Sequence, residues 1–208
     1  MSITVLATFD RKLMVTEQNK QNAEIGQQLF YDEDRRKNYK KAFPLLLDAA
    51  EAGHIHCQNL VGYCYDLGLG VEKNKRQAVF WFNKAAESDH PEALCNLAIC
   101  YDRGVGVEKN KEKAFSFYKR AAEQGDVWAQ CNLGAMYLDG EGVEQNSEQG
   151  IKWTRKAARK GDAKAQYNLG MAYLDGEHLR RNLKQAKMWL TKAAEQGHRK
   201  AKAALQIM

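Results

Sequence analysis

Small and apolar side chains recur along this chain at a fixed step of 36 residues. The clearest marker is a pair of adjacent alanines, which appears as Ala49-Ala50, Ala85-Ala86, Ala121-Ala122, Ala157-Ala158 and Ala193-Ala194. A fixed period of this length is typical of arrays whose units bury their apolar faces only by stacking on one another. We therefore predict five repeats, over residues 19–54, 55–90, 91–126, 127–162 and 163–198, with an N-terminal arm or cap over 1–18 and a capping helix over 199–208.

Each repeat carries two apolar stripes with helical spacing. In repeat 55–90 the first stripe is Cys57, Val61, Gly62 and Tyr65, and the second is Ala78, Trp81, Phe82 and Ala85. Residues three to four apart lie on one face of a helix, so each repeat is predicted to be a pair of helices, called helix A and helix B in chain order. The chain has only two prolines, and the pattern predicts an all-α protein.

Turn signals separate the two helices of a repeat. Gly68 and Gly70 follow the first stripe of repeat 55–90. Because glycine readily adopts the positive φ that ends a helix, they predict the end of helix A. An asparagine then precedes helix B, where its side chain accepts a free backbone N–H; these are Asn38, Asn74, Asn110, Asn146 and Asn182. In the first repeat, Asp32-Glu33-Asp34 replaces the glycine turn and Pro44 falls in helix B, so we expect that repeat to be distorted.

Two segments carry a resemblance to a known family. They are AQCNLGAMYLDGEGV over residues 129–143 and KAAEQGH over 192–198. Both are similar to the Sel1-like repeats, relatives of the tetratricopeptide repeats, and the resemblance covers residues 19–208. It implies a right-handed superhelical α/α solenoid that acts as a scaffold or adaptor, binding a protein or peptide in its concave groove. By family analogy alone, a bacterial immunity or virulence role is possible.

The resemblance also implies where a partner would bind, because helix A lines the concave face of tetratricopeptide solenoids. Trp128 is the predicted anchor, since the same position of the other repeats is polar and the core does not demand an aromatic there. Asparagines at one helix A position offer amides to a peptide backbone, although they could instead bond to neighbouring helices. The predicted contact residues are Tyr63, Asn96, Arg103, Trp128, Asn132, Lys164, Tyr167, Asn168 and Met171, with Cys95 and Cys131 nearby.

Charge is divided unevenly along the chain. Residues 150–208 carry fourteen Lys or Arg and four Asp or Glu, a net charge of +10, whereas residues 1–149 carry eighteen and twenty-two, a net charge of −4. The basic end predicts attraction to an acidic partner, with Arg180, Arg181 and Lys184 as a candidate basic patch. Nucleic-acid binding through this end is the alternative function, and a merely solvated helix surface is the remaining interpretation.

Catalytic and metal motifs are absent from the sequence. The GxG turns lack the strand of a phosphate-binding loop, and no SxxK or GxSxG motif supports the third alternative, a small-ligand hydrolase. His54-Ile55-His56-Cys57 has no second cluster at zinc spacing. We therefore expect no catalysis, cofactor or metal.

The cysteines are odd in number and form no CxxC pair: Cys57, Cys64, Cys95, Cys100 and Cys131. The cysteine-rich branch of the resembled family pairs thiols at positions that hold alanine here. No apolar run approaches the ~20 residues of a membrane span, and the apolar N-terminus lacks the basic start of a signal peptide. We predict free thiols, no membrane association and a cytoplasmic location.

Overall fold

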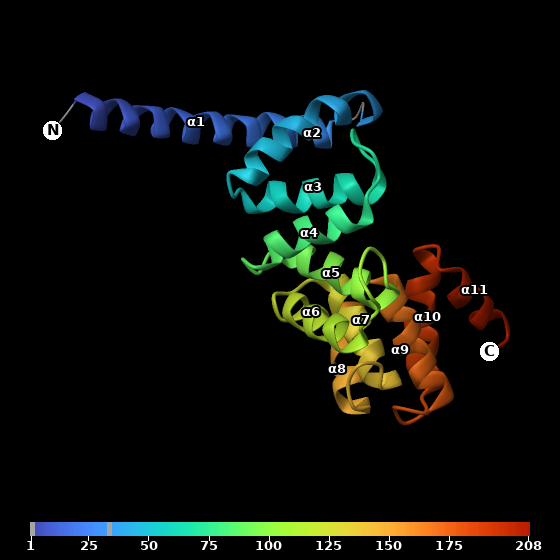
Figure 1. Ribbon diagram of the computed structural model, residues 1–208. Coiled ribbons are helices and arrows are strands. Elements are labelled where there is room, and N and C mark those ends of the chain that lie inside the picture. The colour runs from blue at the N-terminus through green and yellow to red at the C-terminus, as the bar shows by residue number, and fades with distance from the viewer. Residues whose placement is uncertain (1–2, 33–34) are drawn as a thin grey trace. The chain divides into compact units, whose positions relative to one another are not determined.

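The computed structural model describes residues 3–32 and 35–208, and the side chains of residues 16–32 and 38–208. In these parts every regular element is a helix, which confirms the predicted all-α class. The helices are α1 (Ile3–Tyr31), α2 (Arg35–Glu51), α3 (Ile55–Leu67), α4 (Lys75–Ala86), α5 (Pro91–Arg103), α6 (Lys111–Glu123), α7 (Val127–Asp139), α8 (Ser147–Arg159), α9 (Ala163–Asp175), α10 (Leu183–Glu195) and α11 (Arg199–Gln206) (Figure 1).

From α3 onward, odd-numbered helices are the predicted helix A of a repeat and even-numbered helices are helix B, apart from the terminal α11. The chain divides into two compact units. The N-terminal unit comprises residues 1–100 and 104–108, and the C-terminal unit comprises residues 101–103 and 109–208. None of the described helices combines the length and the apolar character that crossing a membrane requires.

Helix B begins where the asparagines predict. The side-chain oxygens of Asn74, Asn110, Asn146 and Asn182 accept the backbone N–H three residues later at 3.1, 2.8, 3.0 and 3.0 Å. Such a cap stabilises a helix by about 1 kcal/mol because the first backbone donors otherwise have no partner. Asn38 is the exception to the prediction: α2 begins earlier, at Arg35, and the Asn38 amide donates to Asp32 instead, at 3.1 Å.

Where the turn carries two glycines, packing requires the second one. Gly106 has a φ of 73°, and a Cβ there would collide with the Lys75 carbonyl at the start of α4. Gly142, with a φ of 69°, meets the Lys111 carbonyl in the same way at the start of α6. A side chain would therefore prevent the turn from lying against the preceding helix B, which supports a structural role for the GxG pattern rather than phosphate binding.

The core follows the predicted columns. One helix A column, Val61, Leu97, Leu133 and Leu169, is fully buried, and so are the alanines Ala78, Ala114 and Ala186 of helix B. Small residues let neighbouring helices approach, as at Gly134, where a Cβ would meet the Thr154 hydroxyl. Stacking of this kind buries apolar side chains between successive helices, as in other helical repeats.

The first repeat departs from the others, as its sequence predicts. Ile25 stands in the buried column but is 38% exposed. Helix α1 is continuous across residue 18, the predicted end of the N-terminal arm, and α2 remains helical through Pro44. Glu33 and Asp34, which replace the glycine turn, lie outside the described residues.

Candidate functional site

The N-terminal unit contains a cavity of about 480 Å³ beside helix A of its second repeat. Its walls are mainly aromatic and aliphatic, with amides and one carboxylate on one side, and its volume lies in the range typical of ligand pockets. The lining residues are Phe30, Tyr31, Tyr39, Asn59, Leu60, Tyr63, Leu67, Leu69, Glu92 and Asn96. Of the predicted contact residues, the structure brings Tyr63 and Asn96 to this cavity.

Aromatic rings from three helices build the apolar wall. Phe30 is buried, and its ring lies 5.2 Å from that of Tyr31, 5.3 Å from Tyr39 and 6.3 Å from Tyr63, all tilted or edge-on. Tyr31 and Tyr63 remain 54% and 41% exposed. Since Phe30 fixes these rings, a partner would meet a preformed apolar surface at little cost in ordering.

The polar side of the cavity is a chain of hydrogen bonds. Asn96 Nδ2 donates to Asn59 Oδ1 at 3.1 Å, and Asn59 Nδ2 donates to a Glu92 carboxylate oxygen at 2.9 Å. Asn96 thus follows the second of the two interpretations of the asparagine column, in which the amides bond to a neighbouring helix. Each bond uses one N–H of an amide that carries two, so the chain retains donor capacity toward the cavity.

Two histidines and a tyrosine adjoin this polar side. The Tyr31 hydroxyl lies 3.3 Å from His56 Nε2, and His56 Nδ1 lies 3.3 Å from His90 Nε2. Burial raises the pKa of Tyr31, and the charge of Glu92 raises it further. Burial lowers the pKa of His90, an effect that Glu92 opposes, so His90 favours its neutral form.

Trp128, the predicted anchor, lies in the C-terminal unit and is 39% exposed. Its ring centroid is 6.2 Å from that of Tyr118. Asn132 donates to the Trp128 carbonyl at 2.9 Å and accepts from Lys164 at 3.0 Å. Trp128, Asn132 and Lys164 therefore form one patch, although the Asn132 amide is already engaged within the chain.

The other predicted contact residues are more dispersed. Tyr167 stacks on His198 with ring centroids 4.6 Å apart, and with Met171 it packs partly buried against the core around Leu190. Arg103 is exposed at the end of α5, and Asn168 is half-buried in α9. Tyr167 therefore contributes to packing at least as much as to an exposed face.

Basic side chains of the C-terminal unit gather along α8, where the sequence analysis did not place them. A cavity of about 650 Å³ is lined by Lys152, Arg155, Lys156 and Arg159, together with Ser147, Glu148, Ile151, His178 and Leu179. The spacing of the four basic residues, three to four apart, is the signal that marks one helix face. The predicted basic patch of Arg180, Arg181 and Lys184 is exposed. It directly follows the lining residues His178 and Leu179 in sequence and extends into the start of α10.

The five cysteines are free and buried, which confirms the predicted thiols. Burial raises the pKa of Cys57 and Cys100 to about 11, and that of Cys64 and Cys131 to about 12. A thiol that stays protonated at neutral pH is a poor nucleophile and a poor metal ligand. These cysteines therefore act as small apolar core residues.

Sequence comparison identifies five copies of the Sel1 repeat, over residues 23–54, 55–90, 91–126, 129–162 and 163–198. The chain belongs to the Sel1 repeat family. A comparison with curated proteins finds no match. Sel1 repeat proteins are generally protein-interaction scaffolds rather than enzymes.

Solved Sel1 repeat structures share this fold. A protective antigen of uropathogenic Escherichia coli with an SLR fold is 32% identical, with a TM-score of 0.81 over 88% of this chain and 39% of the antigen. A Sel1 repeat protein from Oxalobacter formigenes is 34% identical, with a TM-score of 0.80 over 86% of this chain and 70% of its own. An immunity protein from Pseudomonas aeruginosa is 25% identical, with a TM-score of 0.57 over 88% and 67%. This chain thus spans well under half of the E. coli antigen.

Proposed function

We propose that this Sel1 repeat protein is a scaffold that binds an extended peptide segment of a partner protein, with a bulky apolar side chain of the peptide in the cavity of the N-terminal unit. The observation that carries the proposal is the preformed aromatic cavity with Asn59 and Asn96 along one side. Aromatic side chains are the usual anchors of protein interfaces. The amides retain N–H groups for the carbonyls of a peptide backbone.

Peptides selected from a randomised display library on the full-length protein test this proposal. The Tyr63→Ala variant should weaken their binding about thirtyfold or more, the effect of losing an anchor of about 2 kcal/mol. Phe80→Ala is the matched control, because Phe80 is an aromatic of the same unit, 49% exposed and outside the cavity lining. Selected peptides that bind Tyr63→Ala as tightly as the wild type would contradict the proposal.

The second candidate function belongs to the basic surface of the C-terminal unit. We infer that the α8 cavity and the patch of Arg180, Arg181 and Lys184 attract an acidic segment of a protein partner. Nucleic acid remains the alternative ligand for this surface, and a short single-stranded RNA tested beside an acidic peptide at equal charge separates the two. We place the protein in the cytoplasm, where five reduced thiols persist.

A further inference from the structure

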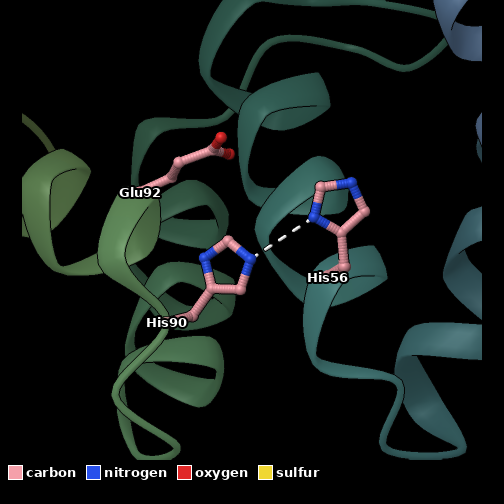
Figure 2. Close-up of side chains that lie close together, drawn as sticks. All are labelled: His56, His90 and Glu92. Atoms are coloured by element: carbon pink, nitrogen blue, oxygen red, sulfur yellow. Dashed lines mark hydrogen bonds between the residues drawn. The ribbon is translucent and has the colours of Figure 1, made fainter. Parts of the chain in front are cut away.

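His56, His90 and Glu92 come together where the second repeat meets the third. Figure 2 shows nitrogen atoms of the two imidazole rings facing each other, with the Glu92 side chain on the side of His90. The ligand atoms of all three lie within 4.8 Å of one another. It is the one group of three or more His, Cys, Asp or Glu with this geometry among the residues whose side chains are described.

We propose that His56, His90 and Glu92 form a binding site for a divalent first-row transition metal, with Zn²⁺ as the ion that probes it. Two imidazoles and one carboxylate make a donor set that such ions accept, and three protein ligands leave one position for water. We expected no metal from the sequence, because His54-Ile55-His56-Cys57 has no partner cluster nearby. The missing ligands are His90, at the end of the same repeat, and Glu92, in the next repeat, and only the fold brings them close to His56.

The distance between the two ring nitrogens suits a shared metal as well as a hydrogen bond. His56 Nδ1 and His90 Nε2 are 3.3 Å apart. Two nitrogens bound to Zn²⁺ at ~2.0–2.1 Å with a tetrahedral angle lie ~3.3 Å apart. The Glu92 side chain is exposed, so its carboxylate has room to move toward the pair.

Neighbouring groups already supply the outer contacts that metal ligands need. With Nδ1 on the metal, His56 Nε2 carries the proton and donates to the Tyr31 hydroxyl, 3.3 Å away. Asn59 donates to one Glu92 oxygen at 2.9 Å and leaves the other for the metal. These two contacts orient the His56 ring and the carboxylate in the way that second-shell partners do.

His90 also caps α5, but through a long hydrogen bond. Its Nδ1 accepts the Ala93 N–H at 3.4 Å, as His54 and His198 cap their helices at 3.4 and 3.2 Å, whereas Asp126 and Asp162 cap the corresponding helices at 2.6 Å. A metal on Nε2 would move the His90 proton to Nδ1 and release only this long bond. At the next junctions the three positions hold Glu92, Asp126 and Trp128, then Trp128, Asp162 and Lys164, so the His-His-Glu set occurs once in the array.

Zn²⁺ titration of the reduced, untagged full-length protein against a chromophoric chelator tests the site. The wild type should bind one Zn²⁺, and His56→Gln and His90→Asn should each weaken it more than about 100-fold, since even outer-shell partners contribute about 10–100-fold. Asparagine keeps the helix cap, and His56 caps nothing, so both variants should melt as the wild type does. Glu92→Gln, which still accepts from Asn59, should weaken binding less.

His198→Asn is the matched control, because His198 caps α11 in the same repeat position without a second histidine. It should bind Zn²⁺ as the wild type does. The proposal is overturned if the folded wild type does not bind Zn²⁺, or if binding persists in both His56→Gln and His90→Asn. It is also overturned if His198→Asn loses Zn²⁺ as they do. The titration contains no peptide, so its outcome is separate from the test of peptide binding in the cavity of the N-terminal unit.

Discussion

His56 in the N-terminal unit and Trp128 in the C-terminal unit occupy the same position of the repeat, but they have different neighbours. His56 faces His90 beside an aromatic cavity, whereas Trp128 is joined through Asn132 to the cation of Lys164. The buried columns beneath them are alike: Val61, Leu97, Leu133 and Leu169 are all fully buried. Buried columns therefore set the fold, while the more accessible positions between them set the chemistry of each unit.

The largest expected effect concerns the columns that the two units share. Leu97→Ala in the N-terminal unit and Leu133→Ala in the C-terminal unit each leave a cavity at a fully buried site. Each should lower the free energy of unfolding by about 2–5 kcal/mol, with similar values for the two. Urea denaturation followed by circular dichroism measures this. A loss below about 1 kcal/mol at either site would break the equivalence of the units.

Thiol labelling compares the burial of one cysteine in the core of each unit, Cys64 and Cys131. At pH 8, a pKa of about 12 for Cys64 and Cys131, against 9.0 for an unburied thiol, reduces the thiolate fraction about a thousandfold. Iodoacetamide should therefore label Cys64 in one unit and Cys131 in the other only slowly in the native protein. Denaturation without reductant should release all five thiols. Mass spectrometry that finds one or three thiols would show disulfides.

The raised pKa values of these thiols make the free energy of unfolding depend on pH. A pKa raised in the folded state means that folding favours the protonated thiol. The contribution of each thiol to stability is therefore complete below pH 9 and declines as the pH rises toward 11 for Cys57 and Cys100, or 12 for Cys64 and Cys131. A Cys64→Ala variant should lose less stability between pH 8 and pH 10 than the wild type.

Trp128→Ala tests whether the patch around Trp128 in the C-terminal unit binds a peptide separately from the cavity of the N-terminal unit. Peptides selected on the Tyr63→Ala variant, whose cavity is impaired, should depend on Trp128 and bind about thirtyfold more weakly when it is truncated. Because Trp128 is 39% exposed, the melting temperature should change little. Calorimetry and a thermal melt on the same variant check both parts. Unchanged binding, or a collapse in the melting temperature, would show that Trp128 is not a partner anchor.

The smallest expected effect is on the rate of association at the basic surface. Changing Arg180, Arg181 and Lys184 to Glu should slow binding of an acidic peptide about tenfold and flatten its salt dependence. The control changes Lys40, Lys41 and Arg76, three exposed cations of the N-terminal unit, to Glu and alters the net charge equally. Stopped-flow rates that fall equally in both variants would mean that net charge alone, and not the basic patch, steers the peptide.

The repeat columns made most of the fold predictable. Ala93 and Leu133 stand in small and aliphatic columns and are fully buried, and Asn74 and Asn146 cap helices as their positions predict. The prediction that Asn38 caps the second helix was wrong, because the first repeat lacks the glycine turn and α2 already begins at Arg35. A repeated position predicts burial reliably where a repeat has another repeat on each side. The prediction is less reliable in the first repeat, at the end of the array.

The candidate sites were only partly predictable. Tyr63 and Asn96 follow from their helix A positions, but Phe30 and Tyr39 come from the irregular first repeat, where no column identifies them. His90 lies at a repeat junction, so its distance from His56 depends on how two repeats stack. Spacing along one helix is visible in sequence, whereas proximity between side chains 34 residues apart requires the fold.

Amide chemical shifts of the isotope-labelled full-length protein, followed while a display-selected peptide is added, locate the peptide site. If the peptide binds in the aromatic cavity, the largest changes fall on Tyr31, Asn59, Tyr63 and Asn96 around it, while Lys152, Arg155 and Arg159 of α8 stay unchanged. Changes centred on α8, or spread over the buried columns of both units, would contradict the claim that the N-terminal cavity is the peptide site.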